Sequence, residues 1–379
     1  MRTDARGNVY ETTELATEEQ VACFASLFVS RREELFSVFQ IGEIKNSSQS
    51  NLRLCHSRDG GETWRAIPGR FRTTFAGEAG SLSNGELVEL RDGRLMLIST
   101  WINRQEPTRP FYDPATEGIL HTRILKSFSS DHGFTWSPWE EIPLFTQGWS
   151  YHTSGPILKS HDGTIMVIVE SHKSFDAFGP STAAEGTWCL ISTDDGTSFQ
   201  GPHLVAQHPE HRLMYWDARL TQGNEPGTWL AMYWTHDQPG QRDLSVHLQL
   251  GRVSPSGITC GPVLDTGIPG QISAPLCLDS NRWLAVAVRR DHPGTITVWQ
   301  TLDAGIRWKC EMTIHSQECG SLVQDRTDLA VAEIWENIRK WSFGHPAIRQ
   351  LDRTHVLVTW YAGTSAKMGV QWARIRLDE

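Results

Sequence analysis

Short runs of apolar and β-branched residues recur along the chain in pairs, and a tight turn separates the two members of each pair. The clearest pairs are GELVELRDGRLMLIST at residues 85–100 and GPILKSHDGTIMVIVES at residues 155–171. Runs of this kind on either side of an Asp-Gly turn are typical of β-hairpins. Looser versions of the pattern occupy residues 25–40, 217–234, 274–288 and 345–361. The pattern therefore predicts six hairpins.

An eight-residue turn recurs after several of these hairpins. Its copies read SRDGGETW (57–64), SSDHGFTW (129–136), STDDGTSF (192–199) and TLDAGIRW (301–308). The last two copies lie about twice as far apart as the others, so a degenerate fifth copy is expected between them, at residues 251–262. In each copy the Asp carboxylate can accept hydrogen bonds from N–H groups of its own turn, the Gly permits a positive φ, and the aromatic residue can pack between neighbouring sheets. We therefore interpret these acids as structural: Asp59, Asp131, Asp194 and Asp303.

Each hairpin is followed by two further strands, which makes six four-stranded antiparallel units. A ring of such units is a β-propeller, a fold that leaves only short, protected sheet edges. The sequence thus predicts an all-β, six-bladed β-propeller that spans residues 1–379 as a single domain. Residues 328–341 have the apolar spacing of a helix and are expected to form a short helical insertion between the last two blades.

Composition agrees with this fold and restricts the partners. Gly (32) and Trp (16) are abundant and charged residues make up only 21% of the chain, as suits short strands and tight turns. The formal net charge of -9 argues against nucleic acid and against anionic membrane surfaces. No segment is long and apolar enough to span a bilayer, and residues 1–20 lack the features of a signal peptide. A cytoplasmic location is expected, and an oligomer is left open.

The repeated turn carries a family resemblance. S-x-D-x-G-x-T-W resembles the Asp-box (BNR repeat) of the sialidase, or neuraminidase, superfamily, whose propellers also have six blades, and the resemblance covers most of residues 24–377. It implies that the Asp-boxes lie on the face away from the active site, and it implies a carbohydrate substrate and glycosidase activity. No cluster of His, Asp or Glu has the spacing of metal ligands, so neither a metal nor another cofactor is expected.

Strand polarity locates the working face. The start of the first strand and the end of the second strand in each hairpin meet on one face, opposite the hairpin turns and the Asp-boxes. These positions gather histidines, arginines, acids and aromatic residues, as a binding site on a rigid scaffold does. We predict catalytic roles for Glu43, His152, Asp217 and His345. We predict substrate contacts for Arg104, His172, Trp216, Arg219, Arg289, Arg290, Asp291 and Tyr361.

The residue types explain these assignments. Histidine titrates in the range that acid–base catalysis needs. Asp217 and Arg219 are two positions apart on a strand and share one side of it, where they can hold a substrate carboxylate and a hydroxyl, although a structural ion pair fits the same spacing. The cluster at residues 289–291 suits an anionic sugar or a solvated loop. The aromatic residues suit sugar stacking or core packing.

The catalytic residues implied by the sialidase resemblance are only partly matched. Cys23 stands where the first substrate-binding arginine is expected, and Glu43 is the only acid in the loop that should supply the acid/base aspartate. Asn84 or Glu86 lies near the place of the glutamate that assists the nucleophile, and no tyrosine begins the last blade. The sequence thus predicts a sialidase-like, exo-acting glycoside hydrolase for an anionic or deoxy sugar. The alternatives are a polysaccharide lyase acting on a uronic acid and a non-catalytic glycan-binding propeller.

Overall fold

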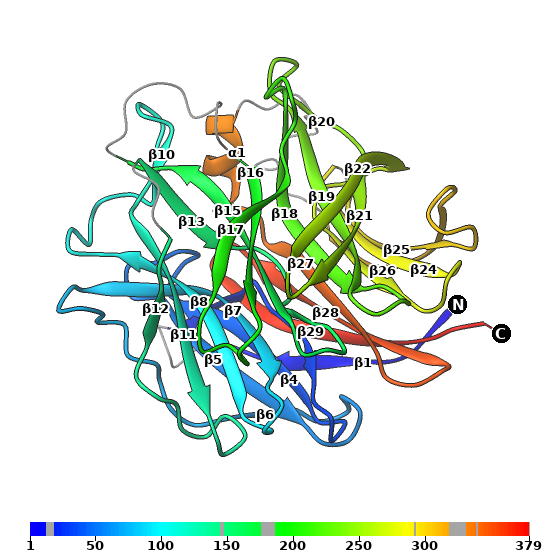
Figure 1. Cartoon of the computed structure of the whole chain (residues 1–379), viewed down its shortest axis with the longest axis horizontal. Coiled ribbons are helices and arrows are strands. Elements are labelled where there is room, and N and C mark those ends of the chain that lie inside the picture. The colour runs from blue at the N-terminus through cyan, green and yellow to red at the C-terminus, as the bar shows by residue number, and fades with distance from the viewer. Residues whose placement is uncertain are drawn as a thin grey trace.

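Six antiparallel blades of four strands form the protein within the residues that the computed structural model describes, with the first strand of each blade innermost (Figure 1). The described residues are 1–12, 19–144, 148–175, 186–291, 293–317, 331–338 and 340–378. A single parallel β-bridge pairs Val21 of blade 1 with Met368 of blade 6. The expected six-bladed β-propeller is confirmed.

Blades 1 to 3 follow one another along the chain. Blade 1 contains β2 (Val21–Cys23) and β3 (Phe28–Val29) as its inner strand, then β4 (Leu35–Gly42), β5 (Asn51–Ser57) and β6 (Arg65–Ala66). Blade 2 contains β7 (Gly80–Glu89), β8 (Leu95–Asn103), β11 (Thr122–Ser129) and β12 (Glu140–Ile142), with the small hairpin of β9 (Tyr112–Asp113) and β10 (Gly118–Ile119) inserted after β8. Blade 3 contains β13 (Trp149–Thr153), β14 (Leu158–Lys159), β15 (Ile165–Lys173), β16 (Gly186–Ser192) and β17 (Gln200–Ala206).

Blades 4 to 6 complete the ring. Blade 4 contains β18 (Leu213–Gln222), β19 (Thr228–Asp237), β21 (Val246–Ser254) and β22 (Gly257–Ile268), and the short β20 (Arg242–Asp243) pairs with β19. Blade 5 contains β23 (Ser273–Cys277), β24 (Trp283–Arg289), β25 (Gly294–Thr301) and β26 (Lys309–Gln317). Blade 6 contains β27 (Phe343–Gln350), β28 (His355–Thr364), β29 (Lys367–Arg376) and, as its outer strand, β1 (Arg2–Tyr10).

The two ends of the chain lie side by side (Figure 1). Because β1 pairs antiparallel with β29, the amino-terminal strand closes the last blade, a pairing that the sequence pattern did not predict. The helix α1 (Val331–Ile338) lies between β26 and β27 in the chain. It confirms the expected helical insertion near residues 328–341, of which 328–330 and 339 lie outside the described residues.

Apolar side chains fill the spaces between neighbouring blades. Successive residues of a strand point to opposite faces, so Leu35 packs with Leu357 of blade 6 while Phe36 packs with Leu97 of blade 2. The middle strands are buried along nearly their whole length, as β4, β8 and β15 show. A strand covered on both faces needs apolar residues at every position, which explains the continuous apolar runs in the sequence.

The repeated turns join the third and fourth strands of blades 1, 2, 3 and 5. In the first copy the hydroxyl of Ser57 donates to Asp59 Oδ1 (2.7 Å), the backbone N–H of Thr63 donates to the same oxygen (2.9 Å), and Trp64 Nε1 donates to the carbonyl of Gly61 (3.0 Å). The expected fifth copy, residues 251–262, also spans the connection between the third and fourth strands of a blade, β21 and β22. Equivalent hydrogen bonds to the carboxylate recur at Asp131, Asp194 and Asp303.

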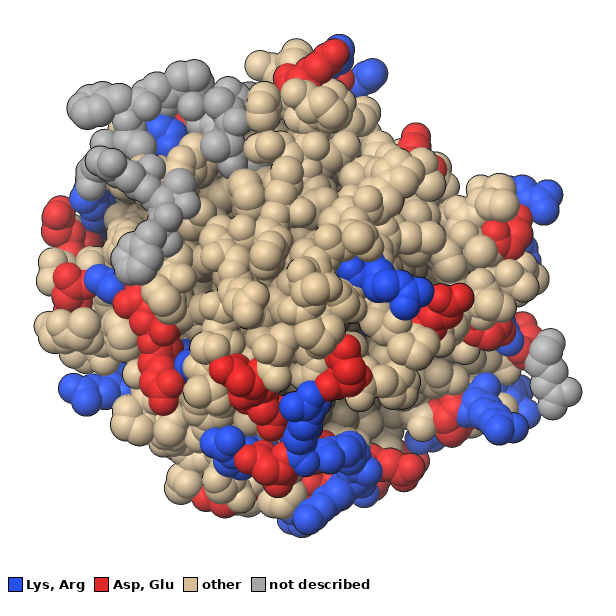
Figure 2. Space-filling view, in the orientation of Figure 1, with Lys and Arg blue, Asp and Glu red and all other residues tan. Residues whose placement is uncertain are grey.

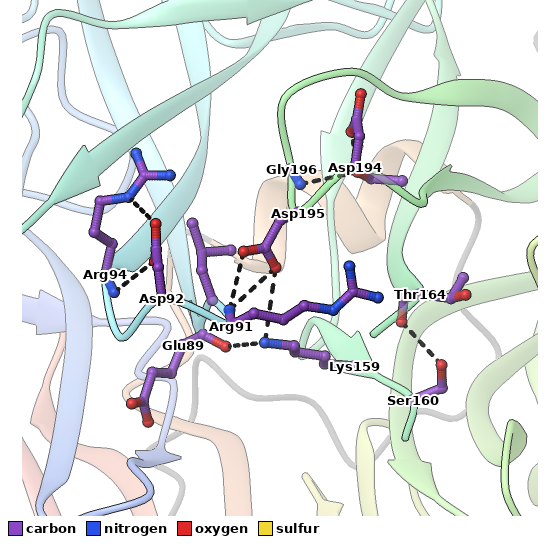
Figure 3. A network of polar contacts seen from close by, with 12 residues as sticks. Glu89, Arg91, Asp92, Arg94, Lys159, Ser160, Thr164, Asp194, Asp195 and Gly196 are labelled. Carbon is purple, nitrogen blue, oxygen red and sulfur yellow. Dashed lines mark hydrogen bonds and ion pairs between the residues drawn. The ribbon is translucent and has the colours of Figure 1, made fainter. Parts of the chain in front are cut away.

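A polar network joins the hairpin turns to the repeated turns on the face of the propeller that carries both kinds of turn (Figure 3). Asp195, in the third repeated turn, accepts a hydrogen bond from the backbone N–H of Arg91 (2.9 Å) and lies 3.8 Å from Lys159 Nζ. Lys159 also donates to the carbonyl of Glu89 (2.7 Å). Arg91 follows β7 and Lys159 ends β14, so the turns of blades 2 and 3 meet here, as strand polarity requires.

The outer surface carries charges of both signs. In the view of Figure 2, lysine and arginine side chains intermingle with aspartate and glutamate around the edge of the molecule, and a broad area between them is uncharged. This face therefore lacks the predominantly basic surface that nucleic acid favours. In the part of the chain that the structure describes, no helix has the length and apolar character needed to cross a lipid bilayer.

Candidate functional site

The inner strands enclose a cavity of about 100 Å³. The first strand of each blade, or the residues directly beside it, contributes to the wall: Phe24, Asn84, Ser154, Asp217, Ile272 and His345. The predicted site residues that line the same cavity are His152, His172, Trp216, Asp217, Arg290, His345 and Tyr361. The hairpin turns and the repeated turns contribute nothing to this wall, so the cavity opens on the face where strand polarity predicts the site.

Three wall residues occupy backbone bulges at equivalent places in alternate blades. Asn84 of β7, Asp217 of β18 and His345 of β27 have φ values of 47°, 48° and 53°, and each lies where the strand register slips. A non-glycine residue in this left-handed region costs about 1–2 kcal/mol, and such strain gathers at functional sites. The bulge takes the side chain out of the regular alternation of the strand and aims it into the cavity.

Two carboxyl groups meet at the wall between blades 3 and 4. Glu170, near the end of β15, is buried and accepts a hydrogen bond from the backbone N–H of Ala218 (2.9 Å) in the bulge that carries Asp217. Burial, together with the negative charge of Asp217, raises the pKa of Glu170 to about 8. Burial also raises the pKa of Asp217, but the positive charges of Arg219 and Arg290 oppose that shift. Burial and the neighbouring carboxyl group thus favour the protonated form of Glu170, and the two arginines favour the ionised form of Asp217.

Two neutral histidines flank this pair. His152 Nδ1 lies 3.0 Å from the carbonyl of Thr153, so Nδ1 carries the proton and Nε2 is the acceptor. Burial lowers the pKa of His152 to about 4. Burial, together with repulsion from the protonated form of His152, lowers the pKa of His172 to about 3. His172 Nε2 lies 3.9 Å from Glu170 Oε2. Among the described residues, no three His, Cys, Asp or Glu side chains gather as metal ligands do.

Arg219 supports the cavity from below. Its side chain is buried, and it donates from Nη2 to His345 Nδ1 (2.6 Å) while Nη1 lies 3.5 Å from Glu86 Oε1. Because the guanidinium can only donate, His345 must accept and is neutral. Burial and the nearby charge of Arg219 accordingly lower the pKa of His345 well below its ordinary value. Arg219 is thus a positioning residue for the strained His345.

Arg290, directly after β24 of blade 5, brings a positive charge to the wall. It is buried, donates to the side chain of Gln271 and to the carbonyl of Phe343 (3.3 Å), and lies 4.1 Å over the ring of Trp341. Gln271 in turn donates to Asp243 (2.8 Å). The Nε atom of Arg290 has no hydrogen-bond partner among the described residues. Arg290 is thus held in place through its two terminal nitrogens.

The helix α1 and Trp341, three positions beyond its end, line one side of the cavity. Ile334, Trp335, Ile338 and Trp341 line it from this side. The first three of these positions follow the i, i+1, i+4 spacing of one helix face, so a single apolar stripe faces the cavity. Trp335 stacks on Tyr112 of the blade 2 insertion, with ring centroids 5.3 Å apart at 12°. We call this apolar surface, formed by Ile334, Trp335, Ile338 and Trp341, the roof.

Lys45, from the turn after β4, fastens the end of the roof. Its side chain is buried, and Nζ donates to the hydroxyl of Tyr361 (2.8 Å) and to the carbonyls of Ile338 (3.3 Å) and Trp341. All three ammonium N–H groups are therefore used. A cation at the carboxyl end of a helix also interacts favourably with the helix dipole.

Replacing Lys45 with methionine is expected to loosen the roof without changing its shape. The substitution keeps the length of the side chain but removes three charge-assisted hydrogen bonds. We expect amide hydrogen exchange in α1 to become at least about tenfold faster, as measured by mass spectrometry of peptides that cover residues 331–341. Lys340→Met removes only the exposed contact with Glu336 in the same segment and should leave the exchange unchanged. Equal amide hydrogen exchange of α1 in the Lys45 variant and in the wild type contradicts the role of Lys45 in holding the roof.

The remaining predicted site residues lie outside the cavity wall. Glu43 is exposed, and Arg104 is buried and donates to Ser81 Oγ (2.9 Å). Arg289 is exposed and pairs with Asp291. Arg219 lies beneath the wall, as described above. Contacts of these residues with a substrate stay predictions.

Sequence reasoning missed three residues that shape the cavity: Glu170, Trp335 and Lys45. Glu170 had a detectable signal, because it is an acid at the end of the apolar run IMVIVES. Trp335 lies in the predicted helix, but nothing in its spacing shows that the helix covers the inner strands. Lys45 is one lysine in a polar turn, and its partners lie more than 290 positions away.

Comparison with known proteins identifies the fold. No protein-family model matches the sequence, and no curated protein resembles it significantly. A protein of unknown function from Dyadobacter fermentans DSM 18053 is 19% identical with a TM-score of 0.69, over 100% of this chain and 99% of that chain. The Hadza microbial sialidase Hz136 is 14% identical with a TM-score of 0.68, over 98% of this chain and 68% of that chain.

A Penicillium chrysogenum alpha-L-arabinanase, solved with arabinobiose, extends the comparison to another glycosidase. It is 13% identical with a TM-score of 0.65, over 99% of both chains. At these identities the similarity concerns the fold, and the chain has the sialidase-like β-propeller fold.

Proposed function

We propose that this protein is an exo-acting glycoside hydrolase that cleaves a terminal sugar bound beneath the roof. The observation that carries the proposal is the pair of carboxyl groups, Glu170 and Asp217, which line one cavity: burial and Asp217 raise the pKa of Glu170, whereas two arginines oppose the rise in the pKa of Asp217. Glycoside hydrolysis by a carboxyl pair needs one protonated acid and one carboxylate on either side of the scissile bond. The similarity in fold to a sialidase and an arabinanase supports the same class of reaction by analogy.

The environment of each carboxyl group gives it a role. Glu170, with a pKa of about 8, keeps its proton at neutral pH and can donate it to the glycosidic oxygen as the bond from that oxygen to the anomeric carbon breaks. Asp217, beside two arginines, is the carboxylate that stabilises the positive charge developing on the sugar. Water then supplies the hydroxyl of the product, and Glu170 regains its proton. Whether Asp217 attacks the anomeric carbon or activates the water decides the stereochemistry of the product.

The shape of the site favours the end of a glycan. The lining residues come from the inner strands on one side and from the roof on the other, and we expect the space of about 100 Å³ between them to take one sugar unit rather than a chain. One terminal unit can enter with its glycosidic oxygen toward Glu170. The neutral His152 and His172 beside Glu170 provide polar contacts for hydroxyl groups without adding charge.

Elimination on a uronic acid is a second candidate, favoured by one observation. His152 is neutral with Nε2 as an acceptor, and Arg290 lines the same cavity, so a base and a cation for a carboxylate are both present.

A purely glycan-binding protein gains nothing from a buried, protonated acid, which costs folding free energy.

The test is a screen of aryl glycosides of both anomeric configurations on the purified protein. We expect release of the phenol from at least one glycoside, with a saturated sugar as the second product in the NMR spectrum. An unsaturated sugar product identifies a lyase instead. If no glycoside is cleaved while the protein binds glycans on an array, the binding function replaces the proposed one.

A further inference from the structure

The two sides of the cavity differ in chemistry. The lower wall carries acids, imidazoles, an amide and a guanidinium, including Asn84, Asp217 and Arg290, beside apolar side chains. The roof presents only the aliphatic side chains of Ile334 and Ile338 and two indole rings. An indole N–H can donate a hydrogen bond but cannot accept one. The four roof side chains therefore offer a bound sugar no hydrogen-bond acceptor, whereas the lower wall offers several.

The roof is fixed rather than adaptable. Ile334 is 1% exposed and belongs to the apolar core between blades 5 and 6. Trp335 is held by the parallel ring of Tyr112, by Phe111 at 5.7 Å and by the edge of His172 at 5.6 Å between centroids. A ring held on three sides cannot turn away to admit water to a buried hydroxyl group.

The backbone carbonyls at the end of the roof are already engaged. The carbonyls of Ile338 and Trp341 accept from Lys45, and Lys45 has spent its three donors. Among the described residues, the four roof side chains offer a hydroxyl group no acceptor for its proton, whereas a methyl group in the same place gains apolar contacts.

We propose that the roof selects a terminal 6-deoxy sugar, whose methyl group packs against Ile334 and Ile338 while its ring hydroxyls face the polar wall. The inference rests on the proposed hydrolase function and names its substrate class. Specificity arises because the competing 6-hydroxy sugar buries a hydroxyl without a partner. A carboxylate at the same carbon is disfavoured by the roof as well, since none of the four roof side chains carries a positive charge.

The experiment compares aryl glycosides that differ only at carbon 6. The sets are D-fucoside, D-galactoside and D-galacturonide; D-quinovoside, D-glucoside and D-glucuronide; and L-rhamnoside with L-mannoside, each in both anomeric forms. In the set that is cleaved, we expect kcat/KM to be at least about tenfold higher for the deoxy member. Binding of the matching free sugars is measured in parallel by quenching of tryptophan fluorescence.

Variants test whether the roof causes the preference for the deoxy sugar. Ile338→Asn places an acceptor on the roof and should reduce the preference for the deoxy member to about threefold or less, through a gain on the hydroxy member. Glu336→Gln changes the exposed side of the same helix and should leave the preference as in the wild type.

The outcomes distinguish a failure of the roof inference from a failure of the hydrolase proposal. Equal or better cleavage of the hydroxy member overturns the roof inference and leaves the hydrolase standing. Preference for the uronide overturns it in favour of recognition by Arg290. Binding of the deoxy sugar without cleavage in any set supports the roof and overturns the hydrolase. Neither binding nor cleavage of any member overturns both.

Discussion

Replacing Glu170 with glutamine is expected to lower kcat/KM for the cleaved glycoside by about 10³-fold. The amide keeps the size of the side chain and can still accept the N–H of Ala218, but it cannot give a proton to the leaving oxygen. General acid catalysis by one positioned group contributes about 10²–10⁴-fold, so the loss should be near the middle of that range for an unactivated leaving group. Aryl glycosides with more acidic phenols should lose less, because their oxygen needs the proton less.

The matched control is Glu225→Gln, in the turn between β18 and β19, where the carboxylate pairs only with the exposed Arg252. Its kcat/KM should equal that of the wild type. A Glu170 variant that keeps activity within tenfold of the wild type, with every leaving group, is incompatible with its role as the acid.

The same substitution makes a prediction about stability that runs opposite to its effect on activity. The folded-state pKa of Glu170, about 8, lies above the unfolded value near 4.5, so the folded protein holds a proton that the unfolded chain releases. The contribution of Glu170 to stability is therefore complete below about pH 4.5 and is lost as the pH rises through 8. Glutamine has no such dependence. The midpoint of thermal unfolding of the variant, relative to the wild type, should rise between pH 5 and pH 9, and a constant difference contradicts the raised pKa.

The fold was accessible from the sequence because the hairpins and the repeated turns are local. Each hairpin is specified by its own apolar runs and turn residues, and the turn around Asp59 is held by its own side chains. Strand polarity then placed Asp217 and His345 at one end of the ring without any knowledge of packing. The pairing of β1 with β29 was not accessible, because it joins positions 360 or more residues apart and has no turn to mark it.

The details of the site depend on packing that no local pattern contains. Arg289 and Arg290 are neighbours at the end of β24, yet one is exposed and the other is buried against Trp341, and sequence alone could not choose between them. The bulge at Asp217 breaks the alternation of β18 and brings the N–H of Ala218 to Glu170, and a bulge has no signature in one sequence. The spacing of Asp217 and Arg219 gave the right strand. The side chain of Arg219 donates to His345 and lies 3.5 Å from Glu86, and its charge also acts on Asp217.

Replacing Asp217 with asparagine should lower kcat/KM by at least about 10³-fold and should also shift the pH dependence of what remains. Asparagine tolerates the φ of 48° at this position, so the bulge should persist, but the carboxylate that stabilises the reacting sugar is gone. The charge of Asp217 is one cause of the high pKa of Glu170, so that pKa should fall in the variant. The alkaline fall of kcat/KM, expected near pH 8 in the wild type, should therefore begin at lower pH in the variant. The measurement is the pH profile of both proteins on one activated aryl glycoside, with Asp352→Asn, in the turn between β27 and β28, as the control that changes neither quantity. An Asp217 variant with a large loss of activity but an unshifted profile shows that the charge of Asp217 does not raise the pKa of Glu170, and a variant with near wild-type activity removes Asp217 from the reaction.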